Sequence, residues 1–168
     1  MGHFVTEQFV AAPLERVFRF FATPLNLPRI SPPAMGARLV GAKLIPPPGA
    51  DPHENLAGRG SEITISVRLL PYFPVRAVWI ARVLEFEWNR YFFDVQARGP
   101  FEKFEHRHEF EAVEQNGRAG TTVRDVIHYE LLFGRMGRMG GERIAERELK
   151  RMFRERHRRT AEALSMAA

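Results

Sequence analysis

The sequence predicts an α+β fold in which a curved antiparallel sheet of about seven strands wraps around a long C-terminal helix. Three observations predict it. Strand patterns follow one another from residue 37 onward without helices between them, which is typical of an antiparallel meander. Two short helical patterns follow the first strand, and a long helical pattern ends the chain. A sheet of this size must curl, so the long helix can lie in its concavity.

The start of the chain predicts one strand and two short helices. Residues 3–10 contain Phe4, Val5, Phe9 and Val10 and are expected to form a strand. Pro13 stands at a tolerated first-turn position of the next helix, in which apolar residues recur at helical spacing. A proline at position 24 should end this helix, and residues 25–30 are expected to form a second short helical turn.

The middle of the chain predicts the remaining strands. The alternation is clearest where Ile63, Ile65 and Val67 are interleaved with polar residues. The prolines of residues 46–52 predict an exposed loop within the domain, because proline cannot donate to a strand ladder. Turns are expected at residues 71–74, 99–100 and 115–118. The expected strands are 37–45, 60–70, 75–87, 90–97, 102–113 and 121–132.

A long final helix is expected at about residues 142–164. Gly134, Gly137, Gly140 and Gly141 precede it and are expected to set the angle at which it begins. The helix carries a narrow apolar stripe, and such a stripe needs a surface to cover it. The stripe consists of Ala145, Leu149, Met152, Phe153 and Leu164.

The composition limits the function classes. A chain of 168 residues fits a single domain, residues 1–168, and 45% hydrophobic content supports a packed core. The absence of cysteine excludes disulfides, thiolate metal sites and cysteine nucleophiles, and it suits a reducing compartment. The sequence has no signal-peptide pattern and no apolar run long enough to span a membrane. We therefore expect a cytoplasmic protein without stable membrane insertion.

The net charge of +5 comes from the end of the chain. Residues 1–133 carry 15 basic and 15 acidic residues, whereas residues 134–168 carry 10 basic and 5 acidic ones. The basic residues are interleaved with glutamates, so pairs such as Glu146–Lys150 should form on a solvated helix. The densest cluster spreads around the helix, and we expect no binding to nucleic acid. This cluster is Arg154, Arg156, Arg158 and Arg159.

Titratable residues fall on strand faces that should otherwise be apolar. Because strand residues alternate sides, Phe104, His106, His108 and Phe110 share one face. On the next strand, one face is shared by Val123, Asp125, Ile127, Tyr129 and Leu131. Burying such polar groups without partners costs roughly 1–3 kcal/mol each. They must therefore satisfy one another or face a cavity that holds water or ligand.

The chemistry of this cluster leaves several interpretations open. We expect Asp94 to join the face of His106, because Gly99 and Pro100 make a tight hairpin between their strands. His106 and His108, together with Asp94 or Asp125, could form a two-histidine, one-carboxylate metal site. The motif is short, however, and pocket histidines more often bond to carboxylates, so we expect no metal and no cofactor. The pKa of Asp125 should rise in an apolar wall unless a neighbouring histidine is protonated.

The element order, together with several motifs, resembles the SRPBCC superfamily, which has the helix-grip fold of START-related lipid-binding domains, birch-pollen-allergen-like proteins and polyketide cyclases. The closer resemblance is to a bacterial subgroup of ligand-binding SRPBCC proteins. The motifs are residues 12–18 (A-P-L-E-R-V-F), 93–96 (F-D-V-Q), 99–101 (G-P-F), 106–110 (H-R-H-E-F) and 120–129 (G-T-T-V-R-D-V-I-H-Y). The resemblance implies a helix-grip domain in which a ligand lies between the sheet and the last helix.

Three functions remain open at this stage. The first is binding of a small, mainly hydrophobic molecule or lipid by a monomer or homodimer. The second is an enzyme of the cyclase or dehydratase kind that uses a His-Asp-Tyr constellation in the same pocket. The third is a basic interaction module that works through the last helix. The expected ligand-binding residues are Asp94, Gln96, Phe104, His106, His108, Phe110, Asp125 and Tyr129.

Overall fold

The computed structural model describes residues 1–51, 53–68, 75–131 and 141–165. Its strands are β1 (Gly2–Val10), β2 (Arg38–Lys43), β3 (Glu62–Arg68), β4 (Arg76–Glu87), β5 (Tyr91–Arg98), β6 (Phe101–Gln115) and β7 (Arg118–Leu131). Its helices are α1 (Leu14–Ala22), α2 (Leu27–Ile30) and α4 (Gly141–Ser165), with 3₁₀ turns η1 (Pro24–Asn26) and η2 (Pro33–Met35). The expected element order is confirmed, and only η2 was not predicted. The glycines expected at 134–140 and the turn expected at 71–74 lie outside the described residues.

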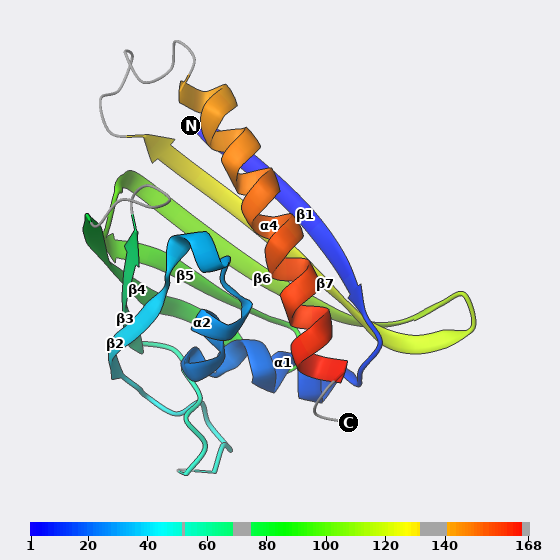
Figure 1. Ribbon diagram of the computed structural model, residues 1–168. Helices are drawn as coiled ribbons and strands as arrows, with labels where there is room; N and C mark the ends of the chain where they lie inside the picture. The colour runs from blue at the N-terminus through cyan, green and yellow to red at the C-terminus, as the bar shows by residue number, and fades with distance from the viewer. Residues whose placement is uncertain (52, 69–74, 132–140, 166–168) are drawn as a thin grey trace.

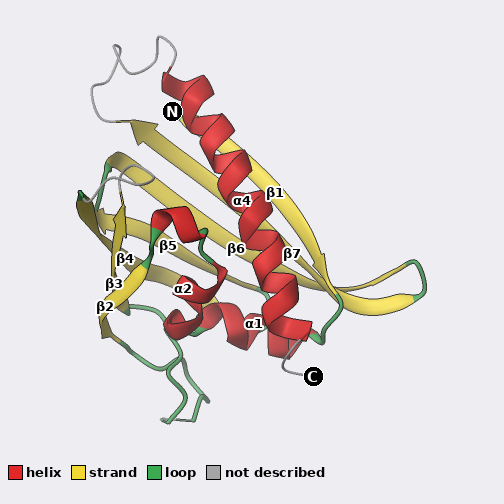
Figure 2. Ribbon diagram, in the orientation of Figure 1, coloured by secondary structure: helices red, strands yellow, loops and turns green. Residues whose placement is uncertain are grey.

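The strands form one antiparallel sheet in the order β1-β7-β6-β5-β4-β3-β2. From β2 to β7 each strand pairs with the next one in the chain, and β1 pairs with β7 at the other edge. The sheet is curved, and α4 lies lengthwise across it near β1 and β7 (Figure 1). The helices gather on one side of the sheet, with α1 and α2 toward one end (Figure 2). The predicted α+β helix-grip architecture is therefore confirmed.

The hairpin of β6 and β7 is longer than its sequence predicted. Its turn consists of Asn116 and Gly117, which both have positive φ, at 53° and 73°. Two such residues suit a two-residue turn that matches the twist of the strands, so pairing continues to Gln115 and Arg118. This long ladder is the frame on which the inward-facing histidines and Asp125 are held in register.

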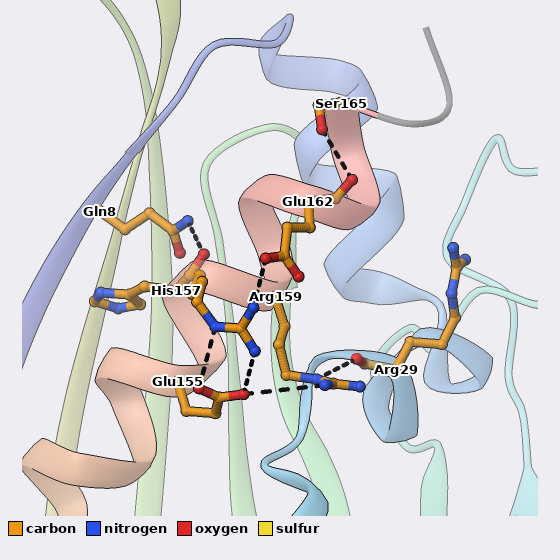
Figure 3. Close-up of polar contacts among 8 residues, drawn as sticks. Gln8, Arg29, Glu155, His157, Arg159, Glu162 and Ser165 are labelled. Carbon is orange, nitrogen blue, oxygen red and sulfur yellow. Dashed lines mark hydrogen bonds and ion pairs between the residues drawn. The ribbon is translucent and has the colours of Figure 1, made fainter.

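Polar contacts fix the C-terminal half of α4 to three other elements. Gln8 of β1 donates to the backbone oxygen of His157 (2.8 Å), and Arg159 donates to the backbone oxygen of Arg29 in α2 (2.9 Å) (Figure 3). Arg16 of α1 reaches the backbone oxygen of Leu164 (2.6 Å). These bonds, more than surface ion pairs, set where the helix passes over the sheet.

The expected charge pairing on α4 is partly visible. Lys150 pairs with Glu146 as expected, and Arg158 pairs with both Glu155 and Glu162. Arg158 and Arg159 are thus engaged with groups of the protein itself. None of the described helices is long and apolar enough to cross a membrane.

Two apolar clusters anchor the helices to the sheet. At one end, Phe18 of α1 is fully buried and stacks edge-on against Phe110 with ring centroids 5.0 Å apart. Along the other edge, Leu149 and Phe153 of α4 pack with Phe4, Phe104, Ile127 and Tyr129. The predicted stripe on the last helix is therefore confirmed as its buried face.

Candidate functional site

A cavity of about 1210 Å³ lies between the concave face of the sheet and α4. Its wall is mainly apolar, with side chains from five strands on one side and from the helices on the other. The sheet side includes Ile63, Ile65, Val67, Trp79, Ala81, Val83, Phe92, Phe104 and Ile127. The helical side includes Phe21, Leu27, Leu149, Met152 and Phe153.

Four polar side chains of the sheet line this wall: Arg68 of β3, Asp94 of β5, and His106 and His108 of β6. Strand alternation puts both histidines on the concave face, and both are buried. The register places Asp94 opposite His106 and His108 opposite Asp125. The predicted inward face is therefore confirmed, and Asp94 lies on the same face as His106, as expected.

Asp125 lies beneath the two histidines and is 1% exposed. Its Oδ1 is 2.8 Å from His106 Nε2, within hydrogen-bond geometry, and 2.7 Å from His108 Nδ1. The second contact is a close ion-pair approach whose angle falls short of a hydrogen bond. The two imidazole rings lie 3.8 Å apart, and His108 Nε2 is 3.6 Å from an oxygen of Asp94.

The two histidines have opposite pKa shifts. Burial disfavours the charged form of His108, but the attraction of Asp125 and contacts with both carboxylates outweigh it and raise its pKa. Burial lowers the pKa of His106, and repulsion from His108 lowers it further, against the opposing effect of Asp125. Burial alone would raise the pKa of Asp125, yet the charge of His108 and the histidine contacts hold it well below the ordinary value. The pKa of Asp125 is therefore lowered and not raised, because a protonated histidine beside it was the stated exception to the expected rise.

These shifts favour an imidazolium at His108, a carboxylate at Asp125 and a neutral His106. Because the carboxylate can only accept, His106 Nε2 must carry the proton that lies between them. Its Nδ1 is then left unprotonated. The cluster therefore combines an internal ion pair with one neutral imidazole in the cavity wall.

The same residues include a group that could hold a metal ion. Asp94, His106 and His108 each offer a ligand atom, and these atoms lie within 4.8 Å of one another. Two histidines and one carboxylate are a known ligand set for divalent metals. Both histidines already contact Asp125, which would orient them toward a metal as well as toward a ligand. The expectation that no metal is bound stays a prediction.

Arg156 of α4 is a cavity residue that the sequence analysis did not select. It lines the cavity, and its guanidinium lies over Phe21 and Phe153, with centroid distances of 5.6 and 5.7 Å. The residue is half-buried overall, but its Nε is fully buried without a hydrogen bond. The sequence did carry a signal for this placement. Arg156 lies three residues after Phe153 and four before Thr160, so the three share one helix face, and both neighbours are buried.

Of the other predicted site residues, Phe104 lies in the cavity wall, whereas Gln96, Phe110 and Tyr129 lie outside the described wall. Gln96 bonds to the backbone of Phe101 (2.8 Å) and closes the turn between β5 and β6. Phe110 packs under α1, and Tyr129 is buried beside Phe104 in the cluster under α4. The described cavity wall thus includes Asp94, Phe104, His106 and His108, with Asp125 in contact behind them.

A comparison with protein families decides the classification. The family model for polyketide cyclase / dehydrase and lipid transport matches residues 10–153. The chain belongs to this family. The match covers the elements from the end of β1 to the middle of α4, so it includes the sheet side of the cavity wall and ends before Arg156. The resemblance to SRPBCC proteins is therefore confirmed, whereas no curated protein sequence matches the chain.

Solved structures of this fold are similar over nearly the whole chain. Protein NE0264 from Nitrosomonas europaea has a TM-score of 0.68 at 12% identity, covering 98% of this chain and 95% of that one. Protein Ms6760 from Mycobacterium smegmatis has a TM-score of 0.65 at 16% identity, covering 99% and 92%. Major latex-like protein 151 from Panax ginseng has a TM-score of 0.59 at 13% identity, covering 92% and 93%. At such identities the similarity establishes the fold alone.

Proposed function

We propose that this protein, acting as one domain over residues 1–168, binds a small, mainly hydrophobic molecule in the cavity between the sheet and α4. The observation that carries the proposal is the cavity itself, at about 1210 Å³. Ligand sites are typically mainly apolar hollows with a few convergent polar groups. Here those groups are Asp94, His106 and His108 on the sheet and Arg156 on the helix.

The exposure of inward-facing apolar side chains supports this proposal. Ile65, Trp79 and Ala81 point to the concave side of the sheet but remain only half-buried, because α4 packs near β1 and β7 instead of over β3 and β4. Apolar surface left in water is unfavourable, and a lipophilic ligand would cover it. The family, which includes proteins of lipid transport, supports the same ligand class.

A substitution that fills the cavity tests the proposal. Replacing Ala81 with phenylalanine puts an aromatic ring into the space that the ligand needs. We expect the affinity for the neutral fluorescent lipophile N-phenylnaphthylamine to fall about tenfold or more, equivalent to about 1.4 kcal/mol. The measurement is a fluorescence titration of the purified protein.

The matched control is Val78→Phe, because Val78 lies on the same strand but is exposed and outside the described cavity wall. It should bind the probe as the unsubstituted protein does. Equal affinity of Ala81→Phe and Val78→Phe would place the probe elsewhere and count against the cavity as the binding site.

A second candidate function is favoured by one specific observation, the neutral His106 held by Asp125. With Nε2 protonated toward the carboxylate, Nδ1 can accept a proton, which is the role of a general base. A fitting reaction is dehydration of a β-hydroxy ketone, in which the base removes the proton next to the carbonyl and then returns a proton to the departing hydroxyl, which leaves as water. The product is a conjugated enone that absorbs in the near ultraviolet.

This candidate is tested with a β-hydroxy aryl ketone as the probe substrate. We expect enone formation above the buffer rate, and we expect it to disappear in His106→Gln while lipophile binding persists. Formation at the buffer rate in the unsubstituted protein, or an unchanged rate in His106→Gln, would exclude the candidate and leave binding as the function.

A further inference from the structure

The buried Nε of Arg156 has no hydrogen-bond partner among the residues that the structure describes. This atom has essentially no solvent access, and no ion pair joins the guanidinium to a carboxylate among the described residues. Burial lowers its pKa, although the charges of Asp125 and Asp94 oppose this effect, and an arginine still stays protonated at neutral pH. The cavity wall therefore holds a fixed positive charge.

The charges around the cavity do not offset that of Arg156. Asp125 is engaged with His106 and His108, and Asp94 lies 3.6 Å from His108. Glu155 is engaged with Arg158. The charged residues in the described wall, besides the histidines, are five arginines and three carboxylates: Arg68, Arg151, Arg154, Arg156 and Arg158 with Asp94, Glu148 and Glu155. The wall thus carries a surplus of positive charge, and Arg156 is the arginine among them whose Nε is fully buried.

The surroundings of Arg156 are suited to holding its guanidinium in place. Phe21 from α1 and Phe153 from the preceding turn of α4 both lie within 6 Å of it. Aromatic faces attract a guanidinium and leave its N–H edges free. Those edges form a planar fork that matches the oxygens of a carboxylate or phosphate. A guanidinium without an ion-pair partner among the described residues, in a mainly apolar cavity, is suited to bind the head group of an amphipathic anion.

We propose that Arg156 binds the anionic head group of a ligand whose apolar body fills the rest of the cavity. This inference rests on the proposed function and specifies its ligand class: a lipophilic carboxylate or phosphate ester. Both head groups present the same chemistry to the arginine, namely a negative charge spread over oxygens that accept two parallel hydrogen bonds.

The test compares three twelve-carbon ligands that differ only in the head group. Dodecanoate, dodecyl phosphate and dodecanol are titrated, below their aggregation concentrations, as competitors of N-phenylnaphthylamine. We expect the protein to prefer one or both anions over dodecanol by about tenfold or more, because charge-assisted hydrogen bonds are stronger than neutral ones. Whichever anion binds more tightly distinguishes a carboxylate from a phosphate ligand.

Substitutions of two arginines on α4 test whether the preference for anions comes from Arg156. Arg156→Gln should bind dodecanol as before and lose the preference for the anions, whereas Arg156→Lys should keep part of it. Arg147→Gln removes the same charge from an exposed position outside the described cavity wall and should keep the full preference. Thermal melts of the variants show which of them are folded. If Arg156→Gln does not fold, the anion preference is measured in Arg156→Lys instead.

The outcomes separate the two proposals. If dodecanol binds as tightly as the anions, or if the preference survives in Arg156→Gln, the anion site at Arg156 is wrong while the lipophile cavity stands. If equal losses follow from Arg147→Gln and Arg156→Gln, the preference comes from the general charge of the helix, and the site is again wrong. If none of the three ligands displaces the probe, the proposed function itself fails.

Discussion

Replacing Asp125 with asparagine is expected to lower the free energy of unfolding by about 3 kcal/mol or more at neutral pH, because removing one partner of a buried ion pair leaves the other uncompensated. Asp125 is 1% exposed and contacts both histidines through one oxygen. Asparagine keeps the shape but removes the charge that makes the imidazolium of His108 tolerable inside the protein. The measurement is urea unfolding followed by circular dichroism.

A carboxylate-to-amide change on the outer face is the matched control. Glu111 of β6 is exposed, so Glu111→Gln should change the free energy of unfolding by no more than about 0.5 kcal/mol. A double variant, Asp125→Asn with His108→Gln, should recover part of the loss, because no buried charge then remains to be compensated at that contact. A loss below about 1 kcal/mol for Asp125→Asn alone would contradict the ion pair as described.

The stability of the protein is expected to pass through a maximum near pH 6.5 and to decline on both sides. The pKa of folded His108 is raised above its ordinary 6.5, so its stabilisation is complete below that pH and is lost as pH rises through the folded value. The pKa of folded His106 is lowered, so the unfolded chain takes up a proton first when pH falls below 6.5. The pKa of Asp125 is held well below 3.8, so its contribution is lost only at still lower pH.

Each of these groups can change the free energy of unfolding by at most about 1.4 kcal/mol per pH unit within its window. His157 on α4, whose pKa is lowered by burial, adds to the decline on the acid side. Chemical unfolding between about pH 5 and pH 9 measures both arms. His108→Gln should flatten the alkaline arm and His106→Gln should weaken the acid arm. A stability that rises steadily from pH 6.5 to 8 would contradict a protonated His108.

Most of the fold followed from patterns that are local in the sequence. Alternation along β6 and β7 correctly put His106, His108 and Asp125 on one face, since a strand residue can face only two ways. The tight turn after Gly99 brought Asp94 opposite His106 as predicted. The length of the β6–β7 hairpin was underestimated, because a four-residue turn at 115–118 was expected where Asn116 and Gly117 alone form the turn.

The set of residues that line the cavity was harder to predict. Strand alternation gives the face of the sheet on which a residue lies, but not which helix, if any, packs over that residue. Phe110 faces the same side as His108, yet α1 covers it with Phe18. Gln96 lies close enough to the turn for its side chain to reach back to Phe101. Arg156 was grouped with the exposed arginines of a basic helix, although its spacing from Phe153 and Thr160 places it on the buried stripe.

The cavity between the sheet and α4 is tested most directly as a ligand site by native mass spectrometry of the freshly purified protein, compared with Ala81→Phe prepared in the same way. We expect a one-to-one adduct of small mass on the unsubstituted protein, which organic solvent extracts and which is absent or strongly reduced in Ala81→Phe. If the protein carries no adduct and binds no lipophile offered to it, or if Ala81→Phe carries the adduct equally well, the cavity between the sheet and α4 is not a ligand site.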